Sequence, residues 1–216
     1  MGPRLLSPLL AVLLMAVPAF SRWCQVENVK SDPNGDYTFS GPWRIDGCTT
    51  LSLDHGKCDE EDCPHRVKFV DDEIIELADA LHGNTVLTAL SMVSNNITDE
   101  SVKAIAEALR DNEALMDLNL YDSMVSDDGA IALAEAFAEN EVFNSLNLEH
   151  NNIGDEGAQV LLDLLKSNES AFETLHLKHN RVSPALLEEI EAEMDRQMRP
   201  PPDLVQQYYD EQRDEL

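Results

Sequence analysis

The sequence predicts an α/β fold, a short solenoid built from stacked strand–turn–helix units. Three observations predict it: an apolar pair with one residue between its members recurs at a fixed spacing, a turn residue follows each pair, and a helical apolar pattern follows each turn. The pairs are Leu90/Met92, Leu118/Leu120, Leu146/Leu148 and Leu175/Leu177, with steps of 28, 28 and 29 residues. One such unit cannot bury its apolar face alone, so neighbouring units are expected to stack and complete a common core.

The strands are predicted from the alternation within each pair, which sends both side chains to the same face. A turn position follows three residues after each pair, and an apolar position follows two residues later. The turn positions hold Asn95, Ser123, Asn151 and Asn180, and the apolar positions hold Ile97, Val125, Ile153 and Val182. An Asn amide can satisfy backbone groups of such a loop. The turns are therefore expected to close alike, apart from the one at Ser123.

The helices are predicted from apolar residues at i, i+3, i+4 and i+7. These faces are Ile74, Leu77, Ala78 and Leu81; Val102, Ile105, Ala106 and Leu109; Ala130, Leu133, Ala134 and Phe137; and Ala158, Leu161, Leu162 and Leu165. The last helix places Leu187, Ile190, Glu191 and Met194 on the same face. Glu191 occupies a position that is apolar in every earlier unit, so this helix is expected to cap the stack.

Written as L-x-x-L-x-L-x-x-N-x-I and followed by a helix, these residues resemble the ribonuclease inhibitor-type leucine-rich repeats, which also occur in tropomodulin-like proteins. The resemblance covers roughly residues 70–194 and departs from the family at Ser123 and at Met92, a softer core residue. It implies a curved solenoid with parallel strands on its concave side and helices on its convex side. It also implies an N-terminal cap that bears cysteines and shields the open end of the core.

The chain is expected to contain four segments. Residues 1–21 are predicted to be a signal peptide, because Arg4 precedes an apolar run that ends in small residues around a cleavage site. The run is too short to span a membrane, so no membrane insertion is expected. The other segments are a Cys-containing cap (22–69), the solenoid (70–198) and a flexible acidic tail (199–216). Within the cap, Leu51 and Leu53 fit a degenerate first strand.

The C-terminal tetrapeptide resembles the Lys-Asp-Glu-Leu and His-Asp-Glu-Leu retrieval signals. Its residues are Arg213, Asp214, Glu215 and Leu216. Together with the signal peptide it predicts residence in the endoplasmic reticulum lumen and binding by the retrieval receptor. Three prolines at 200–202 are expected to stop helical structure and leave the tail exposed.

The charge of the chain is strongly acidic. Removal of the expected signal peptide takes away Arg4 and no acidic residue, which leaves 14 basic and 42 acidic residues and a formal net charge of −28. This excess disfavours binding to nucleic acid and to anionic membranes. It favours basic partners and weak calcium binding, whereas a merely solvated acidic surface is the alternative.

All four cysteines precede the repeats, at Cys24, Cys48, Cys58 and Cys63. An even number in an oxidising compartment predicts two disulfides, for which three connectivities are possible. His55 and His65 lie beside the last two cysteines, so a zinc site of two thiolates and two imidazoles is the alternative. We predict disulfides, and we expect no metal and no cofactor.

Two N-glycosylation sequons begin at Asn96 and Asn168. The repeat register places Asn96 after a strand and Asn168 after a helix, and both are expected to be exposed. Glycosylation of at least one is predicted, with Asn96 preferred because its sequon carries Thr. An accidental pair of sequons in an Asn-rich chain is the alternative.

The candidate binding site is the concave face of the predicted sheet. Its side chains would come from the outward positions of the strands, with Tyr121 as the only aromatic residue among polar neighbours, a pattern typical of protein-binding patches. The predicted site consists of Asp117, Asn119, Tyr121, Asn147, Glu149, His176 and Lys178. Glu149 and Lys178 lie one unit apart and are expected to pair. A solvated sheet without a partner is the alternative.

The sequence therefore predicts a non-catalytic protein-binding module of the endoplasmic reticulum lumen, with an unidentified protein partner. A low-affinity calcium buffer is the alternative function. An enzyme is not expected, because no nucleophile–base pair, phosphate loop or complete metal set is present in the sequence. His150 and His179 occupy equivalent positions, so their rings are expected to come close, as a metal or proton-sensing pair or as chance surface residues.

Overall fold

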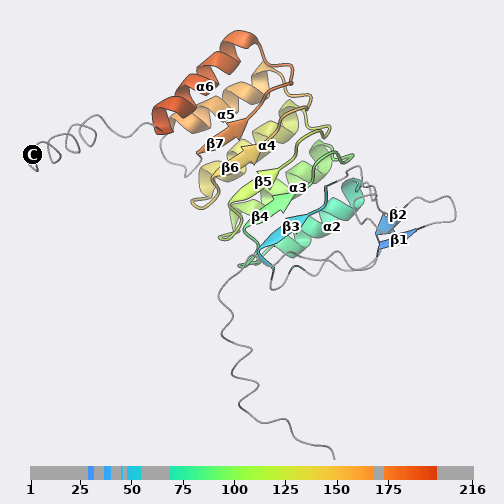
Figure 1. Cartoon of the computed structure of the whole chain (residues 1–216). Coiled ribbons are helices and arrows are strands. Elements are labelled where there is room, and N and C mark those ends of the chain that lie inside the picture. The colour runs from blue at the N-terminus through green and yellow to red at the C-terminus, as the bar shows by residue number, and fades with distance from the viewer. Residues whose placement is uncertain are drawn as a thin grey trace, which may run out of the picture.

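The structure is a computed structural model, and it describes residues 29–31, 37–39, 45, 48–54, 69–167 and 173–198. A parallel sheet runs in the order β3-β4-β5-β6-β7, and helices cover one of its faces (Figure 1). The strands are β3 (Thr50–Ser52), β4 (Ala89–Ser91), β5 (Asp117–Asn119), β6 (Ser145–Asn147) and β7 (Thr174–His176). The helices are α2 (Asp71–Leu81), α3 (Asp99–Arg110), α4 (Asp127–Glu139), α5 (Asp155–Lys166) and α6 (Pro184–Met198). The predicted α/β solenoid is confirmed.

The degenerate first strand expected around Leu51 also forms. β3 pairs with β4 in parallel, with Leu51 opposite Leu90, so the sheet extends into the segment assigned to the cap. Earlier in that segment, β1 (Val29–Ser31) and β2 (Tyr37–Phe39) pair antiparallel. Cys48 lies just before β3, where it is buried and disulfide-bonded. The other three cysteines lie outside the described residues, and the connectivity stays a prediction.

The core consists of columns that run across the units. The register stacks one leucine of every strand on the next, and none of these five is more than 4% exposed: Leu51, Leu90, Leu118, Leu146 and Leu175. The second residues of the predicted pairs and the apolar residues after the turns are buried as well. The predicted helix faces of α2 to α5 are buried throughout, which confirms their register.

Asparagine side chains hold the turns that follow the strands. We call this side of the solenoid the strand-to-helix rim. Asn151 donates from Nδ2 to the carbonyls of Leu120 and Leu148 at 2.8 and 3.1 Å, and its Oδ1 accepts from the Val125 N–H at 3.0 Å. Asn95 and Asn180 make the equivalent bonds in their own units. We call these three residues the turn asparagine ladder.

Ser123 interrupts the turn asparagine ladder, as the sequence predicts. Its side chain is buried, and its Oγ has no hydrogen-bond partner. A serine hydroxyl is too short to span the distance that the Asn amide bridges between neighbouring units. This turn therefore lacks the bonds that tie the others to the preceding unit.

A second ladder holds the opposite side, which we call the helix-to-strand rim. Asn112 donates from Nδ2 to the carbonyls of Leu81 and Asn84 at 2.9 and 3.2 Å, and its Oδ1 accepts from Ala114 and Leu115 at 2.9 and 2.8 Å. Asn140 repeats this set one unit later. The members Asn84, Asn112 and Asn140, spaced by 28 residues, form the helix-to-strand asparagine ladder, and each is at most 6% exposed.

The first residue of a helix caps the next helix in the stack. Asp99 accepts from the N–H groups of Ser126 and Gly129 at the start of α4, at 2.8 and 3.1 Å. Asp127 does the same for α5. Asp71 accepts from the Thr98 N–H and the Ser101 hydroxyl at the start of α3, and Asp155 accepts from the Ser183 N–H before α6. A carboxylate at a helix N-terminus satisfies free N–H groups and complements the helix dipole. This role explains the acidic starts of the helices in the sequence.

The capping carboxylates also explain two glycines and one pKa. A Cβ added at Gly129 would meet Asp99 Oδ1 at 2.5 Å, and one at Gly157 would lie 2.9 Å from the Cα of Asp127, so the close approach requires glycine.

Burial raises the pKa of the Asp71 carboxyl, but hydrogen bonds from side chains and backbone of the next unit outweigh it and hold that pKa below its ordinary value.

The last helix ends the stack as a cap. In α6, Ile190 is 2% exposed, and the acidic residue on its buried side is Glu193 at 6%, whereas Glu191 faces outward. Glu193 pairs with Arg196 one turn later. The expected face is confirmed: Ile190 is buried, Leu187 and Met194 pack against the core, and the exposed Glu191 lies beside them at the end of the stack.

Candidate protein-binding surface

The concave face is the sheet surface that the helices do not cover. Strand alternation turns the predicted site residues away from the helices. Among them, Asp117, His176 and Lys178 are exposed, and Asn119, Tyr121, Asn147 and Glu149 are half-buried. The register places Asn119, Asn147 and His176 side by side on adjacent strands.

Three rings form a column at the edge of this face. The ring centroids of Tyr121 and His150 are 4.8 Å apart with planes tilted by 53°, and those of His150 and His179 are 4.2 Å apart and stacked at 22°. The rings belong to three successive units, and we call them the ring column. Both histidines are exposed. The predicted approach of His150 and His179 is confirmed, and Tyr121 joins them.

The two histidines of the ring column have a backbone conformation that disfavours side chains. His150 and His179 have φ of 57° and 61°, and the equivalent residues Ser94 and Asp122 have φ of 59° and 54°. Left-handed backbone costs a residue with a Cβ about 1 to 2 kcal/mol relative to glycine. An imidazole at a strained, exposed position is an outlier, and such outliers are candidates for a functional role.

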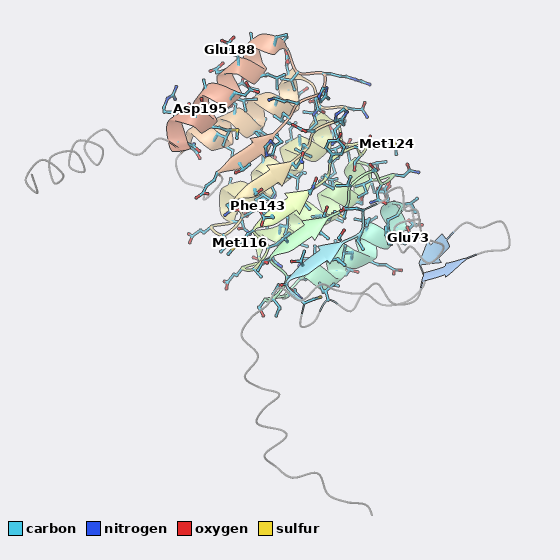
Figure 2. The ribbon with its side chains drawn as sticks, in the orientation of Figure 1. Glu73, Met116, Met124, Phe143, Glu188 and Asp195 are labelled. Carbon is cyan, nitrogen blue, oxygen red and sulfur yellow. The ribbon has the colours of Figure 1, made fainter. Side chains whose placement is uncertain are left out.

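An exposed apolar side chain lies on the same rim. Met124 follows Tyr121 by three residues and is 44% exposed, whereas Met116, 42% exposed, precedes β5. Figure 2 shows the two methionines at opposite ends of the strands, on the two rims. A methionine adapts its shape to a partner surface. The strand-to-helix rim thus combines Tyr121, two imidazoles and a flexible apolar group.

Part of the predicted site is used by the fold itself. The Oδ1 atoms of Asn119 and Asn147 accept from the N–H groups of Tyr121 and Glu149 at 3.1 and 3.0 Å. The first bond holds the backbone of Tyr121 in place, and the second holds that of Glu149. We therefore assign Asn119 and Asn147 a positioning role.

The expected pairing of Glu149 with Lys178 is wrong. The Lys178 ammonium lies 3.3 Å from Glu191 Oε1 on α6, and both side chains are well exposed. α6 lies beside β7 and supplies the nearer carboxylate. Glu149 is thereby left on the concave face without the predicted partner.

A groove of about 290 Å³ opens at the C-terminal end of the face. It lies between β7 and α6, and three of the predicted site residues line it, namely Glu149, His176 and Lys178. Glu191 and Asp195 border it from α6, where Figure 2 labels Asp195. The candidate site therefore has two parts, the ring column and this groove.

The convex face is dominated by exposed ion pairs. Arg110 on α3 lies 3.2 Å from Glu107 and 2.6 Å from Glu139, and the hydrogen bond to Glu139 raises its pKa above the ordinary value. Exposed pairs of this kind contribute little to stability, because water and salt screen them. The residues of these convex pairs are charged, and none of them is aromatic. A substitution among them therefore serves as a control for a substitution on the concave face.

Neither metal binding nor membrane insertion has a structural candidate in the described part of the chain. Within residues 29–31, 37–39, 45, 48–54, 69–167 and 173–198, no three His, Cys, Asp or Glu side chains gather as a metal site would require. His55, Cys58, Cys63 and His65 lie outside these residues. Among the described helices, none has both the length and the apolarity of a membrane span.

The comparisons with known proteins agree with the fold. The sequence profile described as "Leucine Rich repeat" matches residues 83–106 and 139–162. A search of the curated proteins gives no match. The matched segments contain Asn95 and Asn151, and the unit between them is the one that carries Ser123.

Solved structures extend the agreement along the chain. A structure entitled "Leiomodin-1 Actin-Binding Site 2 (ABS2)" is 21% identical with a TM-score of 0.55, over 78% of this chain and 89% of that one. A tropomodulin C-terminal domain from Caenorhabditis elegans is 13% identical with a TM-score of 0.51, over 58% of this chain and 75% of that one. The fold of the chain is that of a leucine-rich-repeat solenoid.

Two features of the site escaped sequence reasoning. The ring column was not predicted as a unit, because Tyr121 does not occupy the position equivalent to His150. That position holds Asp122, and Tyr121 stands one residue before it, yet the Tyr121 and His150 rings still come close. The groove was not predicted, because it depends on how α6 lies beside β7. The sequence does contain a signal for the column. His150 and His179 each stand directly before a turn Asn, at a position where glycine would be favoured.

Proposed function

We propose that this protein is a non-catalytic protein-binding module of the endoplasmic reticulum lumen that docks a partner on its concave face. The ring column carries the proposal. Aromatic groups set among polar neighbours are the residues that dominate protein interfaces, because they bury a large rigid area at low entropic cost. Leucine-rich-repeat proteins in general bind protein partners, and the leiomodin structure is entitled an actin-binding site.

The partner is expected to present a basic surface. Asp117 and Glu149 lie on the concave face, the lysine nearby is paired with Glu191, and the chain carries 27 more acidic than basic residues. Complementary charge steers association and selects partners. An arginine of the partner would meet both the carboxylates and the face of an aromatic ring.

The test is capture of a luminal partner by matched variants after crosslinking. Tyr121→Ala removes the largest ring of the column and is expected to weaken binding by about 2 kcal/mol or more. Glu107→Ala changes only an exposed convex pair and is expected to leave capture unchanged. If Glu107→Ala abolishes capture while Tyr121→Ala binds normally, the partner does not use the concave face.

The luminal location rests on the two ends of the sequence, residues 1–21 and Arg213 to Leu216. The chain lacking the last four residues should appear in the medium, and the intact chain should stay in the cell. Equal secretion of both would exclude the retrieval signal. The actin-binding title of the leiomodin structure is not extended to this chain, because 21% identity supports the fold alone.

A low-affinity calcium buffer is the second candidate, favoured by the 42 acidic residues. The structure reduces the supply of free carboxylates, since the aspartates that begin α2 to α5 already accept N–H and O–H donors. Calorimetry with calcium separates the two functions. Many weak sites that do not saturate support the buffer, and a saturable protein partner supports the module.

A further inference from the structure

β7 ends the described sheet, and its backbone carries hydrogen-bonding groups that every earlier strand uses. The N–H of Leu148, just after β6, donates to the carbonyl of His176 on the next strand at 2.9 Å. Leu177 is the equivalent residue after β7, and no described residue accepts from its N–H. Likewise, the N–H of His150 donates to the next unit at 3.0 Å, and that of the equivalent His179 has no described acceptor. An open edge of this kind is a template for another strand.

The groove between β7 and α6 borders this edge and has an apolar side. Strand alternation turns Leu175 and Leu177 toward the helix layer, and α6 contributes apolar residues from one of its faces. The apolar lining consists of Leu175, Leu177, Leu187, Ile190 and Met194. A side chain that entered the groove from an added strand would therefore meet aliphatic groups of both elements.

The other side of the groove is acidic. Three carboxylates line it, those of Glu149, Glu191 and Asp195, against the single ammonium of Lys178. Lys178 pairs with Glu191 at 3.3 Å, which places this side toward the concave face. Glu149 and Asp195 make no ion pair with any described residue, and Asp195 is exposed. A guanidinium or ammonium group is complementary to this arrangement.

We propose that the open edge of β7 and this groove bind an extended segment of the docked partner in which apolar and basic residues alternate. The segment adds to β7 as a strand and accepts from the N–H groups of Leu177 and His179. Alternate side chains of a strand point to opposite faces, so its apolar residues enter the apolar side of the groove and its basic residues meet the carboxylates. Strand addition of this kind takes affinity from backbone bonds and specificity from alternate side chains.

The proposal rests on the proposed function, because it names the chemistry of the partner that the concave face docks. The two claims concern different residues. Tyr121 carries the proposed docking on the ring column and does not line the groove. A probe of the groove alone therefore separates them.

The probe is the synthetic peptide acetyl-Arg-Leu-Arg-Leu-Arg-amide, added to the full-length protein as secretory cells process it. Its control is the same peptide with methyl groups on the amide nitrogens of the central Leu-Arg-Leu, which keeps the side chains and charge but removes N–H donors. The protein variants are Glu191→Gln and, as the matched control, Glu188→Gln. Glu188, labelled in Figure 2, is exposed on the same helix and lies outside the groove lining.

Calorimetry is expected to find one saturable site for the peptide. The methylated peptide should bind about ten-fold more weakly or worse, because backbone bonds are lost. Glu191→Gln should weaken binding by about five-fold, because it removes a carboxylate and leaves Lys178 unpaired. Glu188→Gln should bind like the parent. Hydrogen exchange followed by mass spectrometry should slow in residues 173–179 when the peptide is added and stay unchanged in residues 115–120.

Equal affinity for the two peptides, or equal losses in Glu188→Gln and Glu191→Gln, would mean that the acidic surface attracts the probe without a site, and the proposal would be wrong. Slow exchange in residues 173–179 that precedes the peptide and does not respond to it would overturn the proposal as well. If that protection fell on dilution, the occupant would be a second copy of the chain, and if it persisted, the chain itself.

Failure of the proposed function gives a different result. Tyr121→Ala should bind the peptide like the parent. If Tyr121→Ala also captured the luminal partner normally, the ring column would lose its role while the groove kept its ligand. If Tyr121→Ala lost the partner but the parent did not bind the peptide, the ring column would stand and the groove proposal would be wrong.

Discussion

The two rims of the solenoid use side chains for different purposes. The helix-to-strand asparagine ladder is unbroken from Asn84 to Asn140, and its amides are nearly inaccessible. The strand-to-helix rim loses its ladder at Ser123, holds four residues at positive φ and displays the ring column. On the proposed function, stability and recognition are divided between the rims. The rim that gives up hydrogen bonds and tolerates strain is the one that carries the residues proposed to contact the partner.

Glycosylation is expected to separate the rims completely. Asn168 lies outside the described residues, but it follows Asn140 by 28 residues, so its sequence position is that of the helix-to-strand asparagine ladder. In Asn112 and Asn140 the Nδ2 atom, which carries an N-linked glycan, donates to backbone carbonyls of the preceding unit. Asn96 is half-exposed on the other rim. We expect a glycan on Asn96 and none on Asn168.

Mass spectrometry of the protein made in secretory cells checks this expectation. Asn96→Gln should remove the glycan mass, and Asn168→Gln should leave it unchanged. A glycan found on Asn168 of the folded protein would show that the ladder ends at Asn140.

The largest loss of stability is expected from Asn112→Ala. The substitution removes four hydrogen bonds and leaves buried backbone groups of two units without partners, which costs about 2 to 4 kcal/mol. Urea unfolding followed by circular dichroism measures the change. Ser123→Ala on the other rim is the control, because removal of a buried hydroxyl without a partner is close to neutral. Equal losses in both variants would contradict the division between the rims.

A gain of about 1 kcal/mol is expected from Ser123→Asn, since a buried hydrogen bond contributes about that much net. The turn asparagines accept from an N–H group 26 or 27 residues earlier, and the amide introduced by this substitution would reach the N–H of Ile97 in the same way. The urea midpoint should rise with no change in slope. A fall in the midpoint would mean that this turn has no room for the amide.

The sequence predicted the strands, the helices and the register of the core because all three are marked by apolar residues that recur at a fixed spacing. Leu51 to Leu175 form one column because each sits in the same position of its unit. The roles of Asp71 and Asn112 were not predicted, although both recur at the period, because a polar residue shows its partner only when the next unit is placed against it. Likewise, the pairing of Lys178 with Glu191 depends on the position of α6, which no repeat encodes.

The smallest effect is expected at His150, and it tests whether strain is retained for the ring column. His150→Gly relieves the strain of the left-handed backbone but raises the entropy of the unfolded chain. The two effects oppose each other, so the free energy of unfolding should stay within about 0.5 kcal/mol of the parent. His150→Val keeps a branched Cβ at the same φ and should lose about 1 to 2 kcal/mol. Both variants lack the imidazole and should weaken partner capture alike. If His150→Gly lost as much stability as His150→Val, the stacked rings would be holding the fold together, and the strand-to-helix rim would lose its claim to a separate role in recognition.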